Sequence, residues 1–236
     1  MKFRLLAPLL LLLATHGLAQ TNPDSAQAGT GTRLLGTIEA GRYHAPDDAF
    51  SVAVPVLHGD NPSITDNGEI VVFRDQVATL LTIAAFRMPA IAKWEHETTE
   101  PREYLIAFFR DNILRDYNRE FPGSQIESAR FLPGFQGGAL VAFALLPGGS
   151  AFAAPASGGA GATPPIAKRG HVVFVRDERI YVVAIELAER VTRGADFKLT
   201  MREEDRVLFD RLITVLAATR FGPEEIPSGI EPPADG

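Results

Sequence analysis

Side chains able to act as metal ligands or general bases are few in this sequence and lie far apart. The chain has no cysteine, which excludes disulfides, a thiolate nucleophile and a cysteine-bound metal. Four histidines follow the N-terminal region, at His44, His58, His96 and His171. No two of them have the spacing that places two imidazoles on one face of a helix. The pattern predicts no metal site and no cofactor.

One polar cluster precedes an apolar run in the stretch "YHAPDDAFSVAVP", Tyr43 to Pro55. A hard-cation or catalytic site built from His44, Asp47 and Asp48 is one interpretation. Turn chemistry is the other, because Pro46 fixes φ and aspartates hydrogen-bond to their own backbone. Apolar side chains then alternate at Phe50, Val52 and Val54. That period of two indicates a strand, so we interpret the cluster as the turn before it.

Recognisable nucleophile and phosphate motifs are missing from the sequence. No serine lies in a Gly-x-Ser-x-Gly elbow, and Ser150 in "GGSAF" falls in a segment rich in glycine and alanine. The glycine-rich stretches at Gly29 and Ser157 do not follow a strand and open a helix, as a phosphate cradle does. Catalysis would require carboxylates and histidines that only the fold brings together.

The connection "RMPAIAKWEHETTE", Arg87 to Glu100, contains the one tryptophan of the chain. An exposed tryptophan among charged residues is typical of an anchor at a protein interface. Lys93, Trp94 and His96 are therefore the candidate partner-binding residues. The simpler interpretation is that Trp94 tucks under the start of the next helix and caps the core.

The chain begins with the features of a cleaved signal peptide. Lys2 and Arg4 precede an apolar run from Leu5 to Ala14, and small residues lead to a cleavage site between Ala19 and Gln20. The run is too short to cross roughly 30 Å of hydrocarbon, and no cysteine follows it to carry a lipid. We expect residues 1–19 to be removed and the protein to be periplasmic or secreted, without a remaining transmembrane segment.

Composition favours one globular domain with an acidic surface. The formal net charge is −6 at pH 7 and 46% of the residues are hydrophobic, which suffices for a core in a single domain. The acidic balance argues against nucleic acid as a partner. We expect a flexible leader at 20–32, the domain at 33–221 and a disordered tail at 222–236. The stretch from Pro147 to Gly170 is predicted to be a flexible insertion loop outside the core.

Hydrophobic periodicity predicts the elements of this domain. Two hairpins are expected, at 70–73 with 78–86 and at 172–175 with 180–187, and a further strand at 139–146. A stripe of large apolar residues predicts a helix at 100–121. The last helix begins with a capping box at Thr200 and Glu203 and buries Leu208, Leu212, Val215 and Leu216.

This order of elements, with "Y-x-x-P" before "F-S-V-x-V-P" and a final helix ending in "ATRF", resembles the PsbP-like superfamily, including bacterial periplasmic DcrB-like proteins. The resemblance implies an α+β fold, an α/β/α sandwich with a central antiparallel sheet. It also implies accessory or adaptor proteins without a shared enzymatic activity. No ligand residues carry over, because the matching residues form strands and turns.

Two functions remain open at this point. The first is an exported periplasmic non-catalytic accessory or binding module, whose partner is another periplasmic or envelope protein. The second is an exported hydrolase with a site assembled from scattered carboxylates and histidines. A buried histidine or carboxylate with a perturbed pKa in a deep pocket would favour the enzyme. Shallow apolar pockets would favour the binding module.

Overall fold

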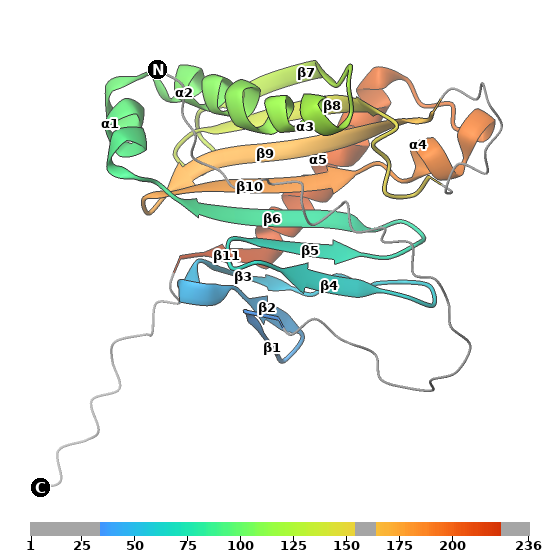
Figure 1. Cartoon of the computed structure of the whole chain (residues 1–236), viewed down its shortest axis with the longest axis horizontal. Helices are drawn as coiled ribbons and strands as arrows, with labels where there is room; N and C mark the ends of the chain where they lie inside the picture. The colour runs from blue at the N-terminus through green and yellow to red at the C-terminus, as the bar shows by residue number, and fades with distance from the viewer. Residues whose placement is uncertain (1–33, 154–163, 223–236) are drawn as a thin grey trace, which may run out of the picture.

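Two antiparallel sheets and the helices packed on them form the domain, in a computed structural model that describes residues 34–153 and 164–222 (Figure 1). The large sheet has the strand order β4-β5-β6-β10-β9-β8-β7, and the small sheet has the order β1-β2-β3-β11. The expected signal peptide, the leader, and the tail beyond Gly222 lie outside the described residues.

The bounds of the elements are as follows. The large sheet consists of β4 (Ser63–Asp66), β5 (Ile70–Arg74), β6 (Leu80–Arg87), β7 (Gln125–Leu132), β8 (Ala139–Pro147), β9 (Ile166–Arg176) and β10 (Arg179–Glu186). The small sheet consists of β1 (Thr37–Glu39), β2 (Arg42–His44), β3 (Phe50–Ala53) and β11 (Thr219–Phe221). The helices are η1 (Pro46–Asp48), α1 (Ala90–Thr98), α2 (Pro101–Phe108), η2 (Phe109–Leu114), α3 (Arg115–Glu120), α4 (Glu189–Thr192), η3 (Gly194–Asp196) and α5 (Met201–Ala218).

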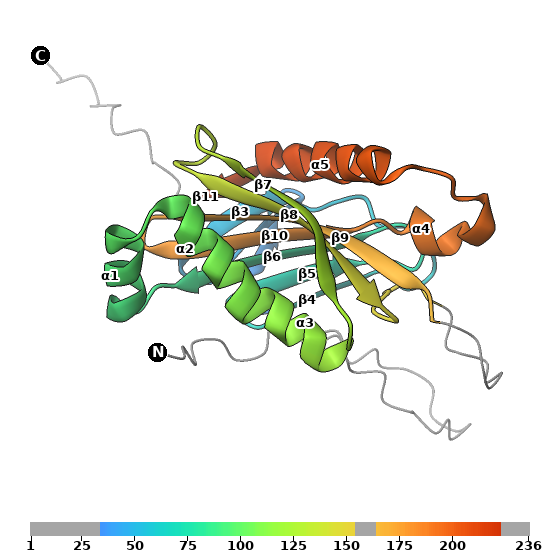
Figure 2. The same ribbon diagram turned by 90° about the horizontal axis from the view of Figure 1, so that it is seen from above.

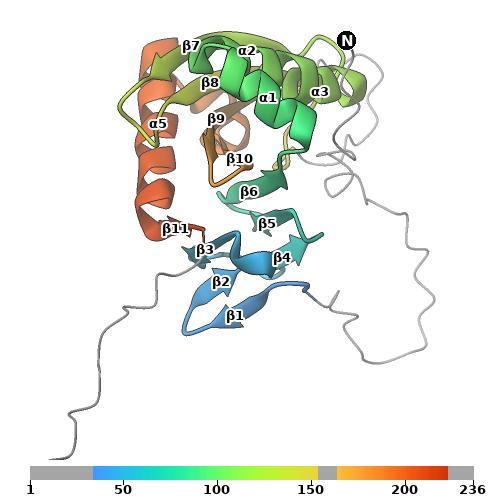
Figure 3. The same ribbon diagram turned by 90° about the vertical axis from the view of Figure 1, so that its left-hand side faces the viewer.

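Helices cover both faces of the large sheet (Figures 2 and 3). The continuous rod α2-η2-α3 packs on one face through Leu105, Phe109 and Ile113. The other face packs against α5 and the small sheet. The expected α+β sandwich around an antiparallel sheet is confirmed. Of the small sheet only β3 was predicted, because its other strands have three residues each and are too short to show a period.

Both predicted hairpins and both predicted long helices are present. The hairpins are β5-β6 and β9-β10, and β6 pairs with β10 at the centre of the large sheet. The predicted capping box is formed, since the Thr200 side chain accepts from the Glu203 backbone N–H and the Glu203 side chain accepts from Thr200. The predicted core face of α5 is buried at Leu208, Leu212 and Leu216.

The predicted insertion loop from Pro147 to Gly170 is wrong at both ends. Pro147 still belongs to β8, and β9 starts at Ile166. Lys168 and Arg169 are buried inside β9, although two consecutive cations resemble a solvated loop in the sequence. Residues 154–163, in the middle of the predicted loop, lie outside the described residues.

In the Tyr43–Pro55 stretch a turn leads into β3, as predicted, but Tyr43 and His44 before the turn belong to β2, so the placement of His44 in the turn is wrong. Pro46 to Asp48 form one turn of helix, with positive φ at Asp47 and Asp48. Tyr43 is buried, and its hydroxyl donates to the Asp66 carboxylate at 2.7 Å. Asp47 forms an ion pair with Arg87 at 3.0 Å. These residues therefore fasten the small sheet to the large one.

Candidate functional site

A buried polar site lies where β9, β10 and α3 meet, and it consists of Tyr117, Arg169, His171 and Glu186. Alternation along β9 explains its position, because successive side chains point to opposite faces of a strand. Arg169 and His171 therefore face the α2-η2-α3 rod, while Lys168, the residue before Arg169, faces α5. None of these four residues was predicted as a site residue. The signal that reveals them in the sequence is charge inside an apolar strand, "IAKRGHVVFV".

Arg169 and Glu186 form the charged half of the site. The Arg169 guanidinium lies 3.1 Å from a Glu186 carboxylate oxygen and also donates to the Gly149 carbonyl at 2.8 Å. The Ser150 hydroxyl and the Ala151 backbone N–H donate to the same carboxylate, at 2.6 and 3.2 Å. Ser150 was expected in a flexible segment, but these contacts hold residues 149–151 against the sheet.

His171 and Tyr117 form the neutral half. His171 Nδ1 lies 3.3 Å from the Ala142 carbonyl, and Nε2 lies 2.8 Å from the Tyr117 hydroxyl. Since the carbonyl can only accept, Nδ1 carries the proton and Nε2 accepts from Tyr117. Burial, with the nearby charge of Arg169, lowers the pKa of His171 to about 3. Burial also raises the pKa of Tyr117.

The pocket beside these residues is small and its walls are mostly apolar. Its lining includes Leu80, Thr82, Ala84, Val182 and Ala184 besides the four polar residues. Its volume of about 20 Å³ holds about one water molecule. A sugar ring or a peptide bond therefore has no room in this conformation.

The chemistry of the site does not suit acid–base catalysis near neutral pH. A general base works best when its pKa lies near the operating pH, and the pKa of His171 is far below it. The imidazole and the Arg169–Glu186 pair already have protein partners. Satisfied hydrogen bonds of this kind rigidify a core. These four residues therefore do not form the site that the alternative function, a hydrolase, would need.

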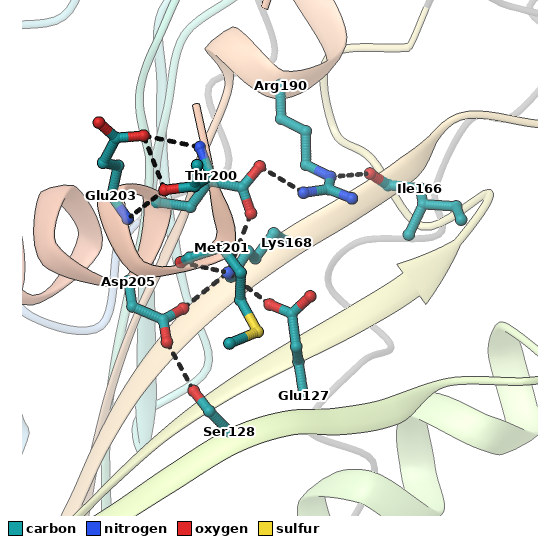
Figure 4. A network of polar contacts seen from close by, with 10 residues as sticks. Glu127, Ser128, Ile166, Lys168, Arg190, Thr200, Met201, Glu203 and Asp205 are labelled. Atoms are coloured by element: carbon teal, nitrogen blue, oxygen red, sulfur yellow. Dashed lines mark hydrogen bonds and ion pairs between the residues drawn. The ribbon is translucent and has the colours of Figure 1, made fainter. Parts of the chain in front are cut away.

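A second polar cluster lies on the opposite face, around Lys168 (Figure 4). Lys168 forms ion pairs with Glu127 and with Glu204 and Asp205, the latter two at 2.9 and 2.6 Å. Arg190 pairs with the other oxygen of Glu204. Burial alone would lower the pKa of Lys168, but the hydrogen bonds that its ammonium donates to the three carboxylates outweigh burial and raise it. Lys168 is therefore a fixed cation that joins α5 to the sheet, and a catalytic lysine would need the opposite shift.

A β-bulge in β7 supplies one of these carboxylates. The register between β7 and β8 shifts between Ile126 and Ser128, so Glu127 is the extra residue. Bulges re-aim side chains, and here both Glu127 and Ser128 reach the α5 side, where Ser128 donates to Asp205 at 2.7 Å. The bulge therefore makes the three-carboxylate arrangement possible.

The remaining histidines lie apart from one another. His44 is on β2, exposed His58 precedes β4, and His96 is on α1 with its ring 5.1 Å from that of Tyr104. Within residues 34–153 and 164–222, no three His, Asp or Glu side chains are arranged to hold a metal ion. Asp47 pairs with Arg87, so it does not join His44 in a cation site.

The predicted partner-binding residues lie on α1, a helix in place of the expected connection. The side of α1 that contains Ile91 and Trp94 faces solvent, with these residues 41% and 59% exposed. Lys93 pairs with Glu178 in the β9-β10 turn, and His96 packs against Tyr104. The simpler interpretation of Trp94 as a core cap is wrong, because Ala92 fills the inward position of this helix.

No family model matches the chain, and no curated protein matches its sequence. Solved structures with a similar fold include PsbP (CyanoP) of Synechocystis sp. PCC 6803, at 13% identity and TM-score 0.44 over 85% of this chain and 99% of that chain. The Ran-binding protein Mog1p of Saccharomyces cerevisiae matches at 8% identity and TM-score 0.45 over 81% and 97%. At this level the likeness carries no functional inference. The finer resemblance to DcrB-like proteins stays a prediction.

Proposed function

We propose that this chain is an exported, non-catalytic accessory or binding module of the periplasm, which binds a protein of the envelope through α1. The observation that carries the proposal is the 59% exposure of the Trp94 side chain. A surface indole exposes a large apolar area to water. When a partner covers this area, its removal from water favours binding.

The interior of the domain supports a binding function over a catalytic one. Its buried histidine is held neutral, its buried cations are paired, and the pocket beside them holds about one water. In contrast, the side of α1 that contains Ile91 and Trp94 is exposed to solvent. Ile91 and Trp94 are three residues apart, so their side chains lie next to each other on the helix. Together they form a compact apolar ridge of the kind that anchors an interface.

The partner interaction is tested with Trp94→Ala. Because Trp94 is largely exposed, the variant should keep the wild-type melting temperature within about 2 °C, as surface substitutions do. Capture of the partner from a periplasmic extract should weaken by at least about tenfold, which is roughly 1.4 kcal/mol.

Ile106→Ala is the matched control, since Ile106 is 40% exposed on α2, outside this ridge. It should bind as the wild type does. Equal capture by wild type and Trp94→Ala would contradict the proposed function. A large loss of thermal stability in Trp94→Ala would show that the indole supports the fold and would remove the reason for assigning it to an interface.

A further inference from the structure

The exposed side of α1 combines apolar and acidic residues at helical spacing. Ile91, Trp94 and Glu97 follow one another at intervals of three residues, and all three are exposed. Residues three apart are neighbours on a helix, with about 5–6 Å between their Cβ atoms. A carboxylate therefore lies one turn from the indole. We call these three residues the α1 ridge.

Carboxylates outnumber cations in the segment that contains the ridge, since residues 90–103 include four glutamates against one lysine and one arginine. Lys93 pairs with Glu178, and Arg87 pairs with Asp47 at 3.0 Å. In contrast, Glu97 and Glu100 are exposed, and in the described part of the chain neither has an ion-pair partner. The segment that contains the ridge therefore has an excess of acidic residues, in keeping with the net charge of the chain.

We propose that the α1 ridge binds a basic peptide segment of the partner, in which an arginine stacks on Trp94 and pairs with Glu97. Tryptophan is the aromatic ring that attracts cations most strongly. A guanidinium stacks flat on such a ring and still presents its edge to a carboxylate. An aliphatic residue beside that arginine would cover Ile91. An acidic segment would meet Glu97 and Glu100 and be repelled. This inference rests on the proposed function and specifies the chemistry of the partner.

The only tryptophan of the chain lies at the centre of the ridge, so intrinsic fluorescence reports binding there directly. The probe is a short synthetic peptide that alternates arginine with leucine, titrated into the full-length mature protein. The control is the same peptide with citrulline in place of arginine, which keeps the shape of the side chain and removes its charge. The arginine peptide should change the tryptophan emission saturably, with about tenfold higher affinity than the citrulline peptide.

Two variants that each remove one negative charge distinguish a direct contact with Glu97 from the effect of the protein's net charge on peptide affinity. Glu97→Gln should weaken the arginine peptide about threefold, as removal of an exposed ion pair does. Glu69→Gln removes the same charge from the exposed β4-β5 turn and should leave the affinity unchanged. Added salt should weaken binding to the wild type more than binding to Glu97→Gln.

Equal affinity for the two peptides, or no emission change with either, would overturn the inference. So would equal effects of Glu97→Gln and Glu69→Gln. The proposed function is judged separately, by partner capture with Trp94→Ala. If that variant loses capture while the peptides bind alike, the function stands and the basic partner is wrong. If it keeps capture, the function itself fails.

Discussion

At the scale of single residues, the interior tolerates charge because its buried ions have partners: Lys168 and Arg169 meet carboxylates, and Asp75 accepts from backbone N–H groups. Lys168 and Glu186 are both 0% exposed, and an isolated ion at such a position would cost several kcal/mol. His171 avoids this cost differently, by remaining neutral between Tyr117 and Ala142. Its neutrality has a measurable consequence for stability.

The pH dependence of unfolding should reveal His171. The pKa of His171 is about 3 in the folded protein, against about 6.5 for an unperturbed histidine. As pH falls below about 6.5, the unfolded chain takes up a proton that the folded protein refuses. The free energy of unfolding therefore decreases, with a slope that approaches about 1.4 kcal/mol per pH unit from this group. Denaturant titrations of the wild type and His171→Gln between pH 7 and pH 4 measure the difference.

His171→Gln should show a shallower decrease than the wild type by about that slope. His58→Gln is the control, because His58 is exposed and meets water in both states. Parallel curves for wild type and His171→Gln would mean that the imidazole takes up its proton in the folded protein. The assignment of a neutral imidazole to His171, hydrogen-bonded to Tyr117, would then be wrong.

At the scale of elements, α5 is held to the sheet by an apolar seam and by one ionic cluster near its N-terminus. The seam runs through Leu208, Leu212 and Leu216. The cluster joins Lys168 of β9 with Glu204 and Asp205 of α5. Lys168 offsets the negative charge of the three carboxylates around it. Without this cation the carboxylates would repel one another and lower the free energy of unfolding.

Lys168→Met should therefore destabilise the protein by about 3–5 kcal/mol, because Glu127 and Asp205, each about a fifth exposed, lose their counter-ion and the buried Glu204 keeps only Arg190. Glu127→Gln should cost about 1 kcal/mol or less, because Glu127 is partly exposed and two carboxylates remain on Lys168. Chemical denaturation of both variants checks this; a Lys168→Met variant as stable as the wild type would contradict it.

Some of these elements could be predicted from the sequence and others could not. The hairpins and α5 were predictable because their apolar residues recur with a local period. The N-terminal part of β9 was not, because Lys168 and Arg169 are explained by partners at Glu204 and Glu186, far along the chain. A cation in the sequence gives no sign of which distant carboxylate will meet it. The exposure of Trp94 could not be predicted either, because it depends on how α1 packs against the rest of the fold.

At the scale of the whole molecule, the proposal places the domain outside the cytoplasm. None of the described helices has the length and hydropathy that a membrane span requires. Export is supported by the basic and apolar segments before Ala19. Intact mass of protein recovered from the periplasm should correspond to a chain that starts at Gln20. A mass that retains residues 1–19 would contradict cleavage at this position.

The central claim is that the molecule works by binding a partner through α1, and hydrogen–deuterium exchange of the partner-bound protein tests it most directly. Backbone amides become protected where a partner covers or orders them. We predict slower exchange in α1 (Ala90–Thr98) and in the adjacent β9-β10 turn, which Lys93 contacts through Glu178. Exchange around Arg169 and His171 should stay the same with and without the partner. Protection at β9 and α3 around that buried site, with α1 unchanged, would contradict the account.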